Sequence, residues 1–140
     1  MYTRELKSRI CILLFLSSFL FFSCQEIIEE RFKREAREYT ERNCPSSMGD
    51  GITVLDSMVF VDNEETGVWG IYYTVFLDDA QKQELKQKKD ELVALNLKFV
   101  KNSPIFIRQK EAGVNFVFVY NDAVTKKKIM ECKYTEKDYK

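Results

Sequence analysis

Two pairs of strand-forming segments, each joined by a turn, restrict the fold of this chain more than any other feature. The first pair, residues 52–61 and 68–77, is rich in β-branched and aromatic residues and flanks the turn-forming residues 62–67. The second pair, residues 114–120 and 127–134, is separated by Asn121 and Asp122. The sequence therefore predicts two β-hairpins.

Helical segments precede each hairpin. Residues 25–43 carry charges of alternating sign at helical spacing, and Pro45 ends this helix. Residues 79–101 follow an N-cap at Asp78 and repeat apolar side chains at steps of 7, 3 and 4, which indicates an amphipathic helix. The apolar stripe consists of Leu85, Leu92, Leu95 and Phe99. The lysines of this helix form a solvent-facing side in the favoured interpretation, with a surface for acidic partners as the alternative.

A shorter element follows Asn102. Ser103 and Pro104 have the residue types of a helix start, and Gly113 can close such a helix. A strand over residues 105–107 is the competing interpretation. The order of elements predicts an α+β fold of helix, hairpin, helix and hairpin. In its simplest form, this fold is one four-stranded antiparallel sheet with helices on one face.

The N-terminal 23 residues have the layout of a cleaved signal peptide. Three cations lie within residues 1–9, residues 10–22 are almost wholly apolar, and Ser23 precedes Cys24. A membrane-spanning helix needs about 20 apolar residues, so a retained anchor is the less favoured alternative. We therefore expect residues 1–23 to be removed and residues 24–140 to form a single domain.

Residues 20–24 resemble a bacterial lipobox, in which the cysteine is acylated before the leader is cut. Phe21 and Phe22 depart from the usual residues but suit the looser pattern of Bacteroidota-type lipoproteins. The resemblance implies lipid attachment at Cys24, a membrane as partner, and a place in the cell envelope on the periplasmic or surface side of the outer membrane. The alternative is a leader that merely ends beside a cysteine.

The remaining cysteines suggest one disulfide. Cys11 leaves with the leader and Cys24 carries lipid, so Cys44 and Cys132 remain in an oxidising compartment. A bridge between them would close a loop of about 90 residues and contribute about 4 to 5 kcal/mol in the chain-entropy model. It requires the end of the first helix to lie against the last strand. Two unpaired thiols are the alternative.

The composition argues against several kinds of chemistry. The chain has no histidine, which excludes Ser-His-Asp and Cys-His catalysis and His-ligated zinc. Removing the leader leaves 22 − 3 = 19 basic and 22 − 1 = 21 acidic residues, so we expect no nucleic-acid partner. Neither a CxxC pair nor a glycine-rich phosphate loop nor EF-hand spacing occurs, and no metal or cofactor is predicted.

Several short motifs resemble a group of small bacterial envelope lipoproteins and exported proteins. They are Cys44-Pro45, the run Thr-Val-Leu-Asp-Ser at 53–57, and Tyr72-Tyr73-Thr74, followed by a lysine-rich helix. This resemblance implies the same order of helices and hairpins and an envelope location. It implies no catalytic residues.

We expect a non-catalytic binding or assembly module that meets a protein partner in the envelope. Trp69, Tyr72, Tyr73 and Phe118 could form the contact patch, because aromatic side chains concentrate interface energy. Packing of these four residues in the core is the favoured alternative. An inhibitor or immunity-type protein, and a small hydrolase that uses carboxylates such as Asp56 or Asp78, are the other hypotheses.

Overall fold

A computed structural model describes residues 27–63 and 65–140 of the chain. The chain divides into two units, the first ending at Phe32 and the second comprising Lys33–Lys140. The described part of the first unit, residues 27–32, is helical. Among the described residues, no helix is both long and apolar enough to cross a bilayer.

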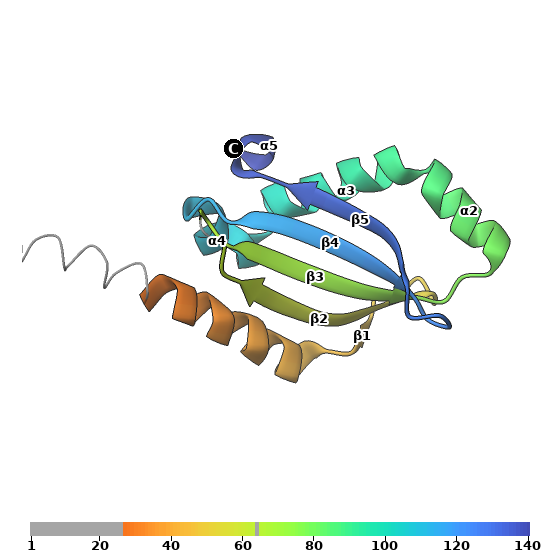
Figure 1. Cartoon of the computed structure of the whole chain (residues 1–140), viewed down its shortest axis with the longest axis horizontal. Helices are drawn as coiled ribbons and strands as arrows, with labels where there is room; N and C mark the ends of the chain where they lie inside the picture. Colours follow the sequence, from red (N-terminus) through yellow and green to blue (C-terminus); the bar gives the residue numbers. More distant parts are fainter. Residues whose placement is uncertain (1–26, 64) are drawn as a thin grey trace, which may run out of the picture. The chain divides into compact units, whose positions relative to one another are not determined.

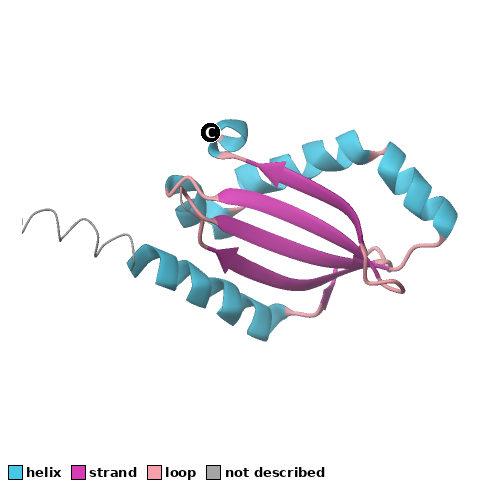
Figure 2. Ribbon diagram, in the orientation of Figure 1, coloured by secondary structure: helices cyan, strands magenta, loops and turns pink. Residues whose placement is uncertain are grey.

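A five-stranded sheet forms the centre of the second unit (Figures 1 and 2). Its spatial order follows the chain, and every neighbouring pair is antiparallel except β3 and β4, which are parallel. The strands are β1 (Ser46–Ser47), β2 (Thr53–Val61), β3 (Val68–Val75), β4 (Asn115–Asp122) and β5 (Lys128–Tyr134). The two predicted hairpins are β2–β3 and β4–β5, and both are confirmed.

The α+β class is confirmed, but the prediction of a four-stranded antiparallel sheet is wrong in two respects. The sheet has the additional strand β1, and its central pair is parallel. The parallel pairing follows from the long helical crossover between β3 and β4, which carries the chain from the end of β3 back to the end of the sheet at which β3 begins. This crossover contains α2 (Asp79–Gln87), α3 (Lys89–Asn102), the 3₁₀ helix η1 (Pro104–Phe106) and α4 (Ile107–Glu111).

One face of the sheet carries the hydrophobic core. Alternate residues of β3 and β4 point toward the helices, and Ile71, Phe116 and Phe118 have no exposed surface. Phe106 of η1 packs on Trp69 and on Phe116, with ring centroids 6.3 and 5.0 Å apart. The helices of the crossover therefore cover this face, as the order of elements predicted. The opposite face is the one seen in Figures 1 and 2.

The N-terminal helix spans residues 27–43, and its part in the second unit, residues 33–43, runs beside β2 (Figure 1). The hydroxyl of Thr40 donates to the carbonyl of Met58 at 2.9 Å and accepts from its N–H at 2.8 Å. Because β1 pairs only with Val54 and Leu55, this hydroxyl satisfies backbone groups on a part of the β2 edge that lacks a neighbouring strand.

The helix predicted over residues 79–101 is interrupted at Lys88, which separates α2 from α3. None of the nine residues of α2 is buried, and the buried residues of α3 are Asn96 and Val100. The short helix after Pro104 is confirmed, and it ends before Gly113, whose φ of 71° is the left-handed conformation typical of a helix end. A last short helix, α5 (Glu136–Tyr139), was not predicted.

The structure does not show the predicted disulfide, and Cys44 and Cys132 are both free thiols in it. Cys44 precedes β1 at one edge of the sheet, whereas Cys132 lies on β5 at the other edge. Neighbouring strands are about 4.8 Å apart, so β2 and β5 alone are separated by roughly 14 Å. A disulfide needs Cα atoms within about 7 Å. The end of the first helix lies beside β2, where Thr40 bonds to the backbone of Met58.

Candidate binding groove

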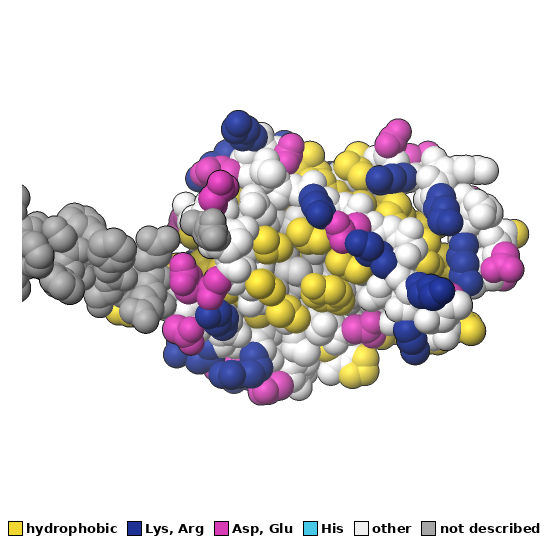
Figure 3. Space-filling model, in the orientation of Figure 1, with side chains coloured by type: hydrophobic (Ala, Val, Ile, Leu, Met, Phe, Trp, Pro, Cys, Tyr) yellow, Lys and Arg dark blue, Asp and Glu magenta, His cyan; other side chains and the backbone are white. Residues whose placement is uncertain are grey.

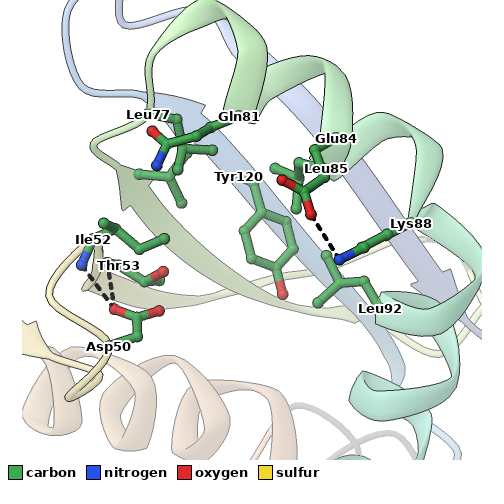
Figure 4. A pocket seen from close by; sticks show the side chains of 11 residues that line it. Asp50, Ile52, Thr53, Leu77, Gln81, Glu84, Leu85, Lys88, Leu92 and Tyr120 are labelled. Carbon is green, nitrogen blue, oxygen red and sulfur yellow. Dashed lines mark hydrogen bonds and ion pairs between the residues drawn. The ribbon is translucent and has the colours of Figure 1, made fainter.

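A groove of about 350 Å³ opens on the helix-covered side of the sheet (Figure 4). One wall comes from α2 and the start of α3, the other from the loop before β2 and the beginning of β2, and the floor comes from β3 and β4. The lining residues are Asp50, Ile52, Thr53, Val75, Leu77, Gln81, Glu84, Leu85, Lys88, Leu92 and Tyr120.

The groove exists because α2 does not pack closely on the sheet. Leu85 and Leu92 are the apolar side chains that the helical wall directs into it, and both remain half-buried. Ile52 faces them from the opposite wall and is 37% exposed. Apolar side chains that face each other across an open space lack the contacts that a core would give them, so the groove has an unfilled apolar surface.

Tyr120 lies at the centre of the groove, between the side chains of the two walls (Figure 4). Its hydroxyl accepts from the amide of Asn96 at 3.0 Å and donates to the amide oxygen of the same residue at 3.2 Å. Burial raises the pKa of Tyr120 to about 12. The phenol is therefore neutral at physiological pH and is held by a buried partner, so it contributes apolar ring surface without a charge.

The acidic groups of the groove are held by neighbouring donors. The N–H groups of Ile52 and Thr53 donate to Asp50 at 2.9 and 2.7 Å. Hydrogen bonding, chiefly from Thr53, lowers the pKa of Asp50. Glu84 forms an ion pair with Lys88 at 2.7 Å. The lowered pKa of Asp50 is the opposite of the raised pKa that a general acid in hydrolysis needs.

Other acids that a carboxylate hydrolase could use have structural roles. Asp78 caps α2 by accepting from the N–H of Gln81 at 2.8 Å. Asp56 accepts a hydrogen bond from the hydroxyl of Thr74. Within the described residues, no group of three or more acidic or cysteine side chains is placed to hold a metal ion. The groove therefore offers a ligand apolar contacts in its interior and polar groups at its rim.

The groove continues as an exposed apolar strip along α3. Leu92 lines the groove, and the next members of the predicted stripe, Leu95 and Phe99, are 62% and 43% exposed. Phe99 makes edge contacts with Phe106 and Phe118 at centroid distances of 5.6 and 6.4 Å, so one side of its ring is packed and the other is open. The stripe that the sequence predicts is therefore only partly used inside the domain.

Three of the four aromatic residues predicted as contact candidates belong to the core. Trp69, Tyr73 and Phe118 are 3%, 7% and 0% exposed, and Tyr73 stacks on Tyr120 with centroids 5.1 Å apart. The favoured alternative of core packing is thus confirmed for these three. Tyr72 lies on the opposite face of the sheet and is half-exposed. The proposed lipid-bearing residue, Cys24, lies outside the described residues.

Sequence reasoning missed most of the groove. The apolar repeat predicts Leu85 and Leu92 as apolar helical positions, whereas Asp50 and Tyr120 carry no signal of a site. Their common location results from the crossover, which brings residues distant in sequence to one end of the sheet. A local signal existed at Ile52, an apolar residue in a glycine-containing loop, but a core position explained it equally well.

These observations define the class of protein as a small α+β domain with helices on one face of a mixed sheet. Residues 27–130 match the family described as domain of unknown function (DUF8479), and the chain belongs to this family. A comparison with curated proteins gave no match.

Two solved structures share the fold. A predicted secreted protein of Pseudomonas aeruginosa has a TM-score of 0.66 and 7% identity, with 80% of this chain and 92% of that chain covered. A pilotin from the Vibrio vulnificus type 2 secretion system has a TM-score of 0.54 and 12% identity, with 82% and 94% covered. At these identities the likeness establishes a common architecture.

Proposed function

We propose that this protein is a non-catalytic binding module of the cell envelope that holds an apolar segment of a partner protein in the groove beneath α2. The observation that carries the proposal is the unfilled apolar surface formed by Leu85, Leu92 and Ile52 around a neutral Tyr120. Burying such surface against a partner contributes about 25 cal/mol per Å². The acids at its rim are already bonded, which favours adhesion over catalysis.

The form of the apolar strip favours a helical partner segment. Leu85, Leu92, Leu95 and Phe99 repeat at the spacing by which one helix packs on another, and they remain partly exposed along α2 and α3. An amphipathic helix whose apolar residues recur every three or four positions matches such a strip along its length. An extended strand would instead need an open sheet edge for its backbone hydrogen bonds.

The envelope location rests on the leader and on Cys24. We propose that Cys24 carries the lipid and tethers the domain to the membrane. The two proteins that share the fold are a predicted secreted protein and a secretion-system pilotin, which supports an exported module with a role in an envelope assembly.

Site-specific photo-crosslinking of the full-length protein in its own membrane tests the groove. A benzophenone amino acid replaces Leu85, which faces the groove, or the neighbouring exposed Lys86 as a matched control on the same helix. We expect a discrete adduct with one envelope protein from position 85 and a much weaker adduct from position 86. Leu92→Gln should reduce the adduct at position 85 because it places an amide in the apolar wall.

The same experiment in a Cys24→Ser background tests the tether separately. Loss of membrane association together with loss of the adduct would support both parts of the proposal. Retention of the protein in the membrane fraction would contradict lipid attachment at Cys24. Equal labelling from positions 85 and 86, or no adduct at all, would contradict the groove as the binding site.

A further inference from the structure

The face of the sheet opposite the helices carries an apolar centre that no described element of the second unit covers. Figure 3 shows this face, with apolar side chains across its middle and charged groups around them. Val59 and Val61 of β2 are 40% and 54% exposed. A shallow hollow of about 340 Å³ lies beside them over β3, β4 and β5, and its apolar lining includes Val61, Val68, Tyr72, Val117 and Val119.

Tyr72 and Gly70 keep this face flat. A Cβ atom built on Gly70 would lie 2.8 Å from Cε2 of Tyr72, so the tyrosine ring occupies the space directly above the glycine. The ring therefore lies along the sheet instead of projecting from it. A flat apolar surface of this kind fits another flat surface better than it fits a single inserted side chain or a small molecule.

On this face, β5 and β2 carry opposite net charges. On β5, Glu131 is bonded to Lys128 at 2.7 Å and to Lys133 at 2.9 Å, which leaves that edge with an excess positive charge. On β2, Asp56 lies on the same face, because it accepts a hydrogen bond from Thr74. One edge is thus cationic, and the other presents a carboxylate.

We propose that a second copy of this chain packs on the open sheet face in a face-to-face dimer. A two-fold axis that runs parallel to the strands between the two sheets would place β5 of one copy over β2 of the other. Lys128 pairs with Asn121, Asn121 with Thr74, and Thr74 with Val54, so these four residues form one row across the sheet. Asp56 lies beside this row, because it accepts a hydrogen bond from Thr74. Lys128 of each copy then meets Asp56 of the other, and the apolar centres meet between them.

The size of the face sets the strength of this dimer. Four strands spaced by about 4.8 Å and eight residues long give a footprint of roughly 500 Å² per copy. The total of about 1,000 Å² is at the lower limit for a specific interface, so the dimer is weak in dilute solution. On a membrane surface, the proposed lipid tether raises the effective concentration and favours pairing. The geometry itself does not depend on the groove.

Photo-crosslinking between two differently tagged copies of the full-length protein in its own membrane tests the dimer. The crosslinking residue replaces Val117 on the open face, or exposed Lys137 as a control on α5, which packs on the other face through Tyr139. We expect an adduct that contains both tags from position 117, and at least fivefold less from position 137.

Charge reversal supplies the decisive comparison. Lys128→Glu alone or Asp56→Lys alone should lower the yield of the two-tag adduct about fivefold, because each change acts twice in a two-fold dimer. The two changes together should restore it. Asp56→Asn removes the charge with little change in shape and should give an intermediate yield. It serves as a control in case the lysine variant does not fold.

Three outcomes would overturn the dimer: absence of a two-tag adduct, failure of the double variant to restore it, or an adduct from position 117 with a different protein. The last outcome would assign the face to another partner. None of these outcomes alters the adduct expected at position 85, so failure of the dimer and failure of the groove can be told apart.

Discussion

Thr40 is a single residue on which one edge of the sheet depends. Its hydroxyl bonds to both backbone groups of Met58, so Thr40→Val would leave a backbone donor and acceptor unsatisfied. We expect a loss of about 1 to 3 kcal/mol in the free energy of unfolding, measured by urea denaturation. Thr40→Ser keeps the hydroxyl and should lose much less. A larger loss in Thr40→Ser than in Thr40→Val would show that the methyl group, and not the hydroxyl, matters.

Asp122 gives the protein a local acid sensitivity. Its carboxylate accepts from the hydroxyl of Thr125 at 2.7 Å and from Lys82 at 3.2 Å. The hydrogen bond from Thr125 contributes most to lowering its pKa from 3.8 to about 2. A lowered pKa stabilises the fold above pH 4, and this contribution is lost as the pH falls from about 4 to about 2.

The variant Asp122→Asn isolates this contribution. We expect its melting temperature to lie below that of the wild type at pH 7, and the difference to shrink as the pH approaches 2, in a thermal-melting series across that range. A difference that stays constant with pH would show that Asp122 acts through its shape and not through its charge.

Among the elements, α3 shows how far sequence patterns predict packing. The helix itself follows from the apolar repeat, but its buried residues are Asn96 and Val100 rather than Leu95 and Phe99. One residue is about 100° of helical rotation, so the face turned toward the sheet is displaced from the strongest apolar stripe. Asn96 can be buried because Tyr120 satisfies its amide. No local pattern reveals a partner 24 residues away.

The same limit explains the sheet and the groove. Each hairpin was predictable because its strands are adjacent in sequence and share a turn. The parallel pairing of β3 with β4 depends on where the crossover helices pack, and the groove depends on how α2 stands away from the sheet. Both are tertiary features, and apolar side chains such as Ile52 and Leu85 look the same in sequence whether they line a groove or a core.

The orientation of α3 can be tested by paired truncations. Val100 is fully buried, so Val100→Ala should cost on the order of 2 kcal/mol in the free energy of unfolding. Leu95 is 62% exposed, and Leu95→Ala should cost well under about 1 kcal/mol. Urea denaturation of the two variants provides the measurement. A larger loss at Leu95 would contradict the orientation of the helix.

For the molecule as a whole, the separation of the two thiols across the sheet predicts insensitivity to reducing agents. Burial raises the pKa of both Cys44 and Cys132, which keeps the thiols protonated and slow to oxidise. We expect an unchanged melting temperature on adding dithiothreitol. Alkylation after unfolding without a reductant should modify both cysteines. A mass two hydrogens lower, with neither cysteine modified, would reveal a disulfide and contradict the fold.

The central parallel pair also has a consequence for the order in which the protein folds. The hairpin β2–β3 can close as soon as Val75 is available, but the other edge of β3 must wait for β4, which begins at Asn115. Until then, β3 presents an unpaired edge of β-branched and aromatic residues, which is prone to aggregation. A chain that is synthesised from its amino end passes through this stage. It therefore avoids aggregation only if chaperones protect the edge or the crossover forms rapidly.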